Sequence, residues 1–241
     1  LATPVTRDDL VARVDAMRAA EDTLRANGRR LYAPIATSVR AATEAVDVNR
    51  IYAYEKALFA FDSKHITQPG NRRAVDWLLE TYRGFGLKAE LQPFRTVATT
   101  ELDVANVVAV IPGTVNPELV YVIGAHFDSR AEGPGADDNT SGTAMILEAA
   151  RVLATRPQPA TLMFVAFTGE EAGLRGAREF GRRMKDSITV VGALNNDMMG
   201  WANDQRMDNT IRYSNPGIRD IQHAAAAQFS AMITYDALYY K

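Results

Sequence analysis

One histidine and several acidic residues stand in three short stretches of the chain, GAHFDSRAEGPGADDNTSG, FTGEEAG and LNNDMMG. The candidate side chains are an imidazole and six carboxylates, namely His126, Asp128, Asp137, Asp138, Glu170, Glu171 and Asp197. Carboxylates held close together repel each other unless one is protonated or a cation lies between them. With a neutral imidazole beside them, a divalent metal is the economical explanation, and this ligand set suits zinc, with manganese or cobalt as alternatives.

Each of these residues also has an ordinary structural interpretation. Glu170 and Glu171 would be first-turn acids that a helix dipole favours, and the Asp137–Asp138 pair would cap a helix. A lone His126 would be a hydrogen-bonded core residue. The joint placement of all of them favours the metal site, because several independent coincidences at one place are less probable than each alone.

The preceding strands explain how these residues could meet. His126 ends the apolar run VYVIGAH, Glu170 and Glu171 follow TLMFVAF, and Asp197 follows TVVGALN. The carboxyl ends of parallel strands share one edge of a sheet, where ligands bind in open α/β folds. Asp138 would join them from the loop that leaves the histidine strand.

Asp128 lies two residues after His126, and this pair is more informative than the histidine alone. Its carboxylate could accept the other ring N–H and hold the imidazole in the ligating tautomer. Cysteine is absent. Disulfides, thiolate zinc sites and a cysteine nucleophile are therefore excluded, which leaves histidine and carboxylates as metal ligands.

Length and composition fit an α/β protein with one large domain. The chain has 241 residues, 47% of them hydrophobic, and a formal net charge of −2, which gives no electrostatic reason to expect nucleic acid or an anionic membrane as partner. No apolar run approaches the ~20 residues of a membrane-spanning helix. The chain begins with Leu1 and not with Met, which suggests either a removed leader or a trimmed sequence, and we favour a leader and a secreted or periplasmic location.

The expected elements alternate along the chain. Helices are predicted in residues 6–30, 46–61, 72–86, 140–154, 170–185 and 216–229, and strands in 105–113, 118–128, 161–167 and 189–195. We expect the first two strands to be neighbours, Asn71 and Asn215 to cap helices, and the sheet to be mostly parallel with helices on its faces. Residues 1–47 are predicted to be a helical extension and residues 48–241 the catalytic domain.

Together these stretches resemble the zinc aminopeptidases of metallopeptidase family twenty-eight, which includes bacterial leucyl aminopeptidases, glutaminyl cyclases and glutamate carboxypeptidase. The resemblance covers roughly residues 48–197, through PGNRRAVD, GAHFDS, PGADDNTSG, FTGEEAGLRGA and LNNDMMG. It implies a zinc-exopeptidase-like three-layer sandwich. It also implies that His126 and Asp197 bind one zinc, that Glu171 binds a second, that Asp138 bridges both, and that Glu170 is the general base.

The family pattern has a fifth ligand, a histidine on a later loop, and no matching segment precedes Lys241. His65 and His223 do not match that motif and are interpreted as structural or surface residues. We therefore expect the catalytic domain to be incomplete at its carboxyl end, with one zinc possible in place of two.

The predicted function is that of a metal-dependent exopeptidase with a peptide substrate, most simply an aminopeptidase that uses a metal-bridged water and a glutamate base. The alternatives are a non-catalytic or impaired binding domain on a peptidase fold, a single-zinc glutaminyl cyclase, and a carboxypeptidase. Met198, Met199 and Trp201 could line a side-chain pocket or belong to the core. Oligomeric state and substrate preference stay open.

Overall fold

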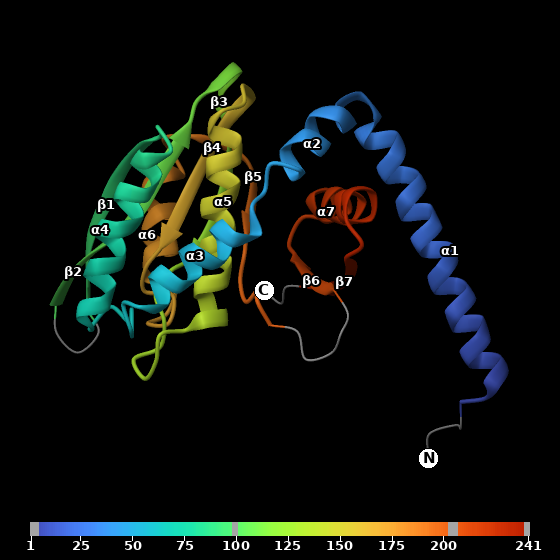
Figure 1. Cartoon of the computed structure of the whole chain (residues 1–241), viewed down its shortest axis with the longest axis horizontal. Helices are drawn as coiled ribbons and strands as arrows, with labels where there is room; N and C mark the ends of the chain where they lie inside the picture. The colour runs from blue at the N-terminus through green and yellow to red at the C-terminus, as the bar shows by residue number, and fades with distance from the viewer. Residues whose placement is uncertain (1–4, 98–100, 202–206, 239–241) are drawn as a thin grey trace. The chain divides into compact units, whose positions relative to one another are not determined.

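The apolar runs in the middle of the chain form a five-stranded sheet with helices against both faces (Figure 1). The computed structural model describes residues 5–97, 101–201 and 207–238. The chain divides into two compact units, one of Ala45–Trp201 and one in which Leu1–Glu44 joins Ala202–Lys241. The first unit carries the sheet and all of the candidate site residues.

The Ala45–Trp201 unit alternates strands and helices. Its elements are α3 (Val48–Phe59), α4 (Pro69–Gly84), β1 (Lys88–Val97), β2 (Glu101–Ile111), β3 (Gly113–His126), the irregular helical turn η2 (Ala136–Ser141), α5 (Gly142–Ala154), β4 (Gln158–Phe167), α6 (Arg175–Met184) and β5 (Thr189–Asn195). Strand β5 has the predicted bounds, whereas β1 was not predicted.

The strand order is β1-β2-β4-β3-β5. Strand β2 pairs antiparallel with β1 and with β4, while β3 pairs parallel with β4 and with β5. Four strands therefore run in one direction and β2 runs in the other. This confirms the predicted mostly parallel sheet.

The prediction that β2 and β3 are neighbours is wrong, because β4 lies between them. Only Pro112 separates the two strands, which is too short a link for a hairpin turn. The start of β3 shifts register twice between Gly113 and Val120 along β4. Gly113 packs so closely on β4 that a Cβ there would lie 2.7 Å from the carbonyl carbon of Ala160.

Side chains alternate between two apolar layers, as strands buried on both faces require. Val107 of β2 packs in the larger core with Leu147 of α5 and with buried residues of α3 and α4. The next residue, Val108, packs on the opposite face with Phe180 of α6. The predicted three-layer α/β arrangement is thus confirmed.

Helix α4 begins earlier than predicted, at Pro69 with Gln68 as its N-cap, so the predicted cap Asn71 lies inside the helix. The Asn71 side chain is buried and donates instead to the carbonyl of Lys64 and to Oγ1 of Thr168, each at 2.8 Å. Asn71 therefore ties the helix to the loop that follows β4.

The second unit contains α1 (Arg7–Tyr32), η1 (Ala33–Ile35), α2 (Ala36–Thr43), β6 (Asp208–Tyr213), α7 (Pro216–Phe229) and β7 (Ile233–Leu238). Strands β6 and β7 are parallel and are joined by α7. The predicted cap of α7 is confirmed, since Asn215 Oδ1 accepts a hydrogen bond from the amide of Ile218 at 3.1 Å. Arg25 of α1 donates to the carbonyl of Ala227 in α7 at 2.9 Å.

Residues 202–241 cluster with the N-terminal helices, although the sequence assigns them to the catalytic domain. The predicted division into residues 1–47 and 48–241 stays a prediction about the domains of this protein. In the described part of the chain, no helix combines the length and the apolar character that crossing a membrane requires.

Candidate metal centre

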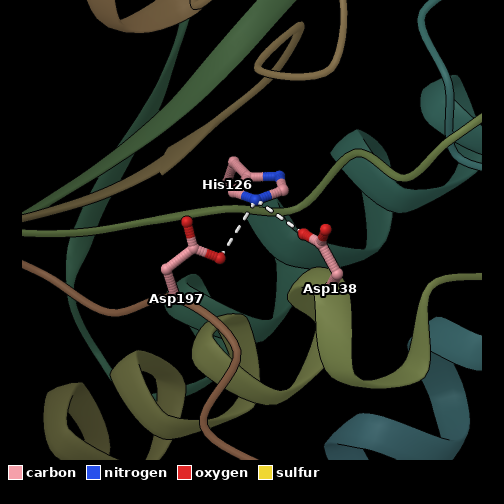
Figure 2. Close-up of side chains that lie close together, drawn as sticks. All are labelled: His126, Asp138 and Asp197. Atoms are coloured by element: carbon pink, nitrogen blue, oxygen red, sulfur yellow. Dashed lines mark ion pairs between the residues drawn. The ribbon is translucent and has the colours of Figure 1, made fainter. Parts of the chain in front are cut away.

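His126, Asp138 and Asp197 converge at the carboxyl edge of the sheet (Figure 2). The Nε2 atom of His126 lies 3.1 Å from Oδ1 of Asp138 and 3.4 Å from Oδ1 of Asp197. The imidazole is buried, whereas the two carboxylates are partly exposed. The structure thus brings together three of the four residues expected to bind metal.

Strand register places His126 and Asp197 level with each other. In the parallel β3–β5 pair, Gly124 is the partner of Asn195, and each candidate ligand follows two residues later. The amide of Asn196 extends this pairing by donating to the carbonyl of Gly124 at 2.8 Å. Residues far apart in the sequence therefore meet because their strands are neighbours in the sheet.

Asp138 reaches the site because η2 is not a regular helix. The backbone of Asp138 itself is non-helical, with φ −102° and ψ 95°. Gly135 precedes the turn with φ +58°, and a side chain there would overlap the carbonyl of Asp138. Thr143 Oγ1 then ties the turn to β3, donating to the carbonyls of His126 at 2.9 Å and of Asn139 at 3.0 Å.

Asp128 is fully buried and links the imidazole to the two glutamates. Its Oδ1 lies 3.5 Å from Nδ1 of His126, and its carbonyl lies 3.1 Å from the same nitrogen. With two acceptors facing Nδ1, the proton belongs on that atom, which leaves Nε2 free to bind metal. The Asp128 carboxylate also accepts hydrogen bonds from the amides of Glu170 at 3.1 Å and Glu171 at 3.2 Å.

Glu170 and Glu171 lie in a loop and not in the first turn of a helix, because α6 begins only at Arg175. The amide of Gly176 donates to the carbonyl of Thr168 at 2.9 Å and closes this loop. Both the ordinary interpretation as first-turn acids and the predicted helix start at residue 170 are therefore wrong.

Glu171 lies outside the three-residue cluster. Its Oε2 is 3.4 Å from Nε of Arg130, while its Oε1 is buried and has no hydrogen-bond partner in the part of the chain that the structure describes. A buried carboxylate oxygen without a partner is costly unless a cation or a water satisfies it. This unsatisfied oxygen fits the expected role of Glu171 as a metal ligand.

The electrostatics of the cluster favour a cation. Burial disfavours a charged His126, but hydrogen bonds to Asp128 and Asp197 outweigh it and raise the pKa of the imidazole to about 10. The surrounding carboxylates thus favour a positive charge at Nε2, which a metal ion would supply in place of a proton. Burial raises the pKa of Glu170 and of Glu171, and nearby carboxylates raise it further although His126 opposes the change. The donor set of one imidazole nitrogen and carboxylate oxygens fits zinc.

Sequence reasoning missed Lys64, whose side chain is fully buried. Its Nζ donates to the carbonyl of Pro134, and its amide donates to Oγ of Ser129 at 2.9 Å. Burial lowers the pKa of Lys64 to about 8, although Asp128 and Asp62 oppose that change. No sequence signal distinguishes this lysine from an exposed one, since lysine is almost never buried.

The two other histidines make local hydrogen bonds. His65 Nδ1 lies 2.8 Å from Oγ1 of Thr67. His223 is buried in the second unit, with its two ring nitrogens 2.6 Å from Oγ1 of Thr234 and 2.6 Å from Oδ1 of Asp236. Among the described residues, neither belongs to a metal-binding cluster.

The imidazole and carboxylates lie at the carboxyl ends of the strands of an open α/β sheet, the edge at which this class of fold binds its ligands. The chain belongs to peptidase family M28, whose profile matches residues 106–240. This finding confirms the resemblance of the sequence motifs.

Fungal proteins similar in sequence to this chain are named as zinc metalloproteases. A probable zinc metalloprotease of Pyricularia oryzae is 34% identical over 193 residues, which cover 70% of this chain and 38% of that protein. A probable zinc metalloprotease of Leptosphaeria maculans is 32% identical over 193 residues, covering 70% of this chain and 45% of the relative. The chain thus spans less than half the length of these relatives.

Solved structures of similar fold include the LapA aminopeptidase of Legionella pneumophila, with a TM-score of 0.73 and 20% identity over 85% of this chain and 59% of LapA. The glutaminyl cyclase of Porphyromonas gingivalis has a TM-score of 0.67 and 20% identity over 82% of this chain and 77% of the cyclase. At this identity the likeness establishes the shared fold.

Proposed function

We propose that the Ala45–Trp201 unit carries the metal centre of a zinc-dependent aminopeptidase, which removes the N-terminal residue of a peptide. The observation that carries this proposal is the convergence of His126, Asp138 and Asp197 at the sheet edge. Membership of a peptidase family and the names of the fungal relatives support zinc as the metal and a peptide as the substrate.

His126, Asp138 and Asp197 would hold one zinc ion through Nε2 and two carboxylate oxygens. Asp138 and Glu171 would provide oxygen ligands to a second, and the unsatisfied Oε1 of Glu171 supports this role. Bound zinc lowers the pKa of a water molecule and polarises the scissile carbonyl.

Glu170 is the proposed general base. Its amide is held by the Asp128 carboxylate, and burial raises the pKa of its own carboxyl, which strengthens it as a proton acceptor. Glu170 would take a proton from the attacking water and deliver it to the leaving amine nitrogen as the C–N bond breaks. The proton accepted in the first step is thus used in the second.

The direct test is hydrolysis of leucine p-nitroanilide by the purified chain. We expect turnover that a chelator abolishes and added zinc restores, with no cleavage of the N-acetylated anilide. Discrimination against the blocked substrate would show that a free α-amino group is required, as in an aminopeptidase.

Three results would contradict the proposal in different ways. Equal cleavage of the blocked and free anilides would exclude an aminopeptidase. Conversion of an N-terminal glutamine to pyroglutamate, without anilide hydrolysis, would indicate the glutaminyl cyclase alternative. Tight zinc binding without either reaction would indicate a non-catalytic binding domain.

A further inference from the structure

The segment that follows Asp197 is held by side chains of the segment that contains Asp138. Three consecutive backbone amides donate to three side chains of residues 137–141. The pairs are Met198 N with Asn139 Oδ1 at 3.2 Å, Met199 N with Ser141 Oγ at 2.9 Å, and Gly200 N with Asp137 Oδ1 at 2.8 Å. We call these three hydrogen bonds the 137–141 clamp.

Asn139 contacts the backbone on both sides of Asp197. Its Nδ2 donates to the carbonyl of Asn196 at 2.9 Å, while its Oδ1 accepts from the amide of Met198 at 3.2 Å. The same Oδ1 accepts from the amide of Gly142 at 2.9 Å, and the side chain is fully buried. The Asn139 amide group therefore fixes the backbone position from which the Asp197 side chain extends.

Gly142 leaves the space that this arrangement needs. A Cβ at Gly142 would lie 2.5 Å from the carbonyl oxygen of Asn196 and would also overlap the Asn139 side chain. Close backbone approach of this kind is a common reason for a glycine. The glycine in the NTSG stretch is thus explained by the contact between the two ligand-bearing segments.

The clamp matters because Asp197 has little other support beyond the hydrogen bonds of the preceding Asn196 to the carbonyl of Gly124. It follows β5, which is at the end of the strand order and pairs with β3 alone among the described strands. Its side chain is 46% exposed. Without hydrogen bonds from another segment, a loop after an edge strand would not keep its carboxylate within ligand distance of His126.

We propose that Asn139 is a positioning residue of the metal centre, which sets Asp197 against His126 and Asp138 by holding the backbone on either side of Asp197. This inference rests on the proposed function insofar as zinc is the ion at the site. The clamp itself is a property of the chain that can be tested in the metal-free protein.

Asn139→Asp separates geometry from charge. The substitution keeps an acceptor for Met198 but replaces the donor to Asn196 with an oxygen. Added negative charge alone would strengthen zinc binding, whereas loss of the hydrogen bond to the carbonyl of Asn196 weakens it. We expect Asn139→Asp and Asn139→Leu to weaken zinc binding by about 10- to 100-fold, the usual effect of losing a residue that orients metal ligands.

Thr161→Val is the matched control. Thr161 is also buried, and its hydroxyl accepts from the amide of Gly113 at 3.0 Å and donates to the carbonyl of Pro117 at 2.7 Å. It lies toward the start of β4, whereas His126 is paired with Phe167 at the end of that strand. We expect Thr161→Val to lower stability without changing zinc affinity.

Three measurements decide the proposal. Zinc affinity is measured by competition with a chromophoric chelator, and the visible spectrum of the cobalt-substituted protein reports the ligand arrangement. Hydrogen exchange in the chelator-treated protein then reports protection of the amides of residues 198–200. We expect Asn139→Asp and Asn139→Leu to change the zinc affinity and the cobalt spectrum. Asn139→Leu should also lower protection of the Met198 amide, and Ser141→Ala that of the Met199 amide, while Thr161→Val should change none of the three readouts.

Unchanged protection of the Met198 amide in Asn139→Leu and of the Met199 amide in Ser141→Ala would overturn the clamp. Lost protection with unchanged zinc affinity and cobalt spectrum would overturn the positioning role. If Asn139→Leu does not fold, Asn139→Asp and Ser141→Ala, which removes the acceptor for Met199, still decide the matter. Absence of zinc binding by the wild-type chain would contradict the proposed function, while exchange would still test the clamp.

Discussion

Glu170 and Glu171 are adjacent in sequence, yet their surroundings differ. Both amides are held by Asp128, but Glu171 faces Arg130 with one oxygen and leaves the other buried and unsatisfied. Burial raises the pKa of both carboxyl groups, and nearby carboxylates add to this effect while His126 opposes it. The buried, unsatisfied oxygen supports a ligand role for Glu171, and the raised pKa of Glu170 supports a proton-transfer role.

Glu170→Gln tests the base. The amide cannot accept the proton from water, so we expect kcat for leucine p-nitroanilide to fall by about 100-fold or more. Zinc content, measured by atomic absorption, should be unchanged. Glu132→Gln is the control, because Glu132 is an exposed acid on the loop between β3 and η2. Near-normal turnover by Glu170→Gln would contradict the assignment of Glu170 as the general base.

The lowered pKa of the buried Lys64 predicts that the stability of the protein depends on pH. Its pKa in the folded protein is about 8, lower than the ordinary value of 10.5, because the side chain is buried. Between these values the unfolded chain binds more protons, so this group makes the folded state more stable as pH rises from about 8 to 10.5. Below this range Lys64 is protonated in both the folded and the unfolded state, so burial of its charge destabilises the folded state to the full extent.

The Lys64→Met variant has no titratable group at this position. The difference in unfolding free energy between wild type and Lys64→Met, measured by urea denaturation, should therefore shift in favour of wild type across that pH range. The exposed Lys56→Met variant serves as the control and should follow the wild-type pH dependence. A constant difference between wild type and Lys64→Met would contradict the lowered pKa.

Among the elements, the loop between β4 and α6 is fixed at its ends by strand β2. Buried Asn106 accepts from the amide of Thr168 at 3.1 Å, and it donates to the carbonyl of Gly176 at 2.9 Å and to Gln92 Oε1 at 2.9 Å. One side chain thus joins the two ends of the loop that carries both glutamates.

Asn106→Leu should destabilise the protein by about 1 to 3 kcal/mol, because it leaves buried backbone groups unsatisfied. It should also lower kcat for the anilide, since the loop carrying Glu170 loses its anchors. Chemical denaturation and steady-state kinetics check the two effects. Thr161→Val is again the comparison, and an equal loss of kcat in both variants would show that the effect is one of general stability.

On the scale of the whole molecule, all of the proposed ligands lie in the Ala45–Trp201 unit, while His223 lies in the other unit. Both ring nitrogens of His223 are engaged, by Thr234 and Asp236.

We therefore expect His223→Gln to keep wild-type zinc content and affinity and to lose about 1 kcal/mol of stability from its hydrogen bonds. His126→Gln should lose zinc binding. Equal zinc loss in the two variants would show that the second unit contributes a ligand.

Most of the strands and the candidate site could be predicted from local patterns. Apolar runs placed β3, β4 and β5, and the polar residues after them identified the sheet edge. Strands β1, β6 and β7 were missed, and the order of β2, β4 and β3 was mispredicted. Strand order depends on which apolar surfaces pack together after α5 returns the chain, and local composition does not contain that information.

The sequence by itself determined the chemistry available to this protein: an imidazole and carboxylates after apolar strands, no thiols, and motifs of one peptidase family. Only the tertiary structure decided that Asp128 holds the amides of both glutamates, that Lys64 is buried, and that Asn139 brackets Asp197. The physical reason is that these contacts join segments distant in sequence. Their partners are backbone groups, which every residue carries and which therefore leave no mark in the sequence.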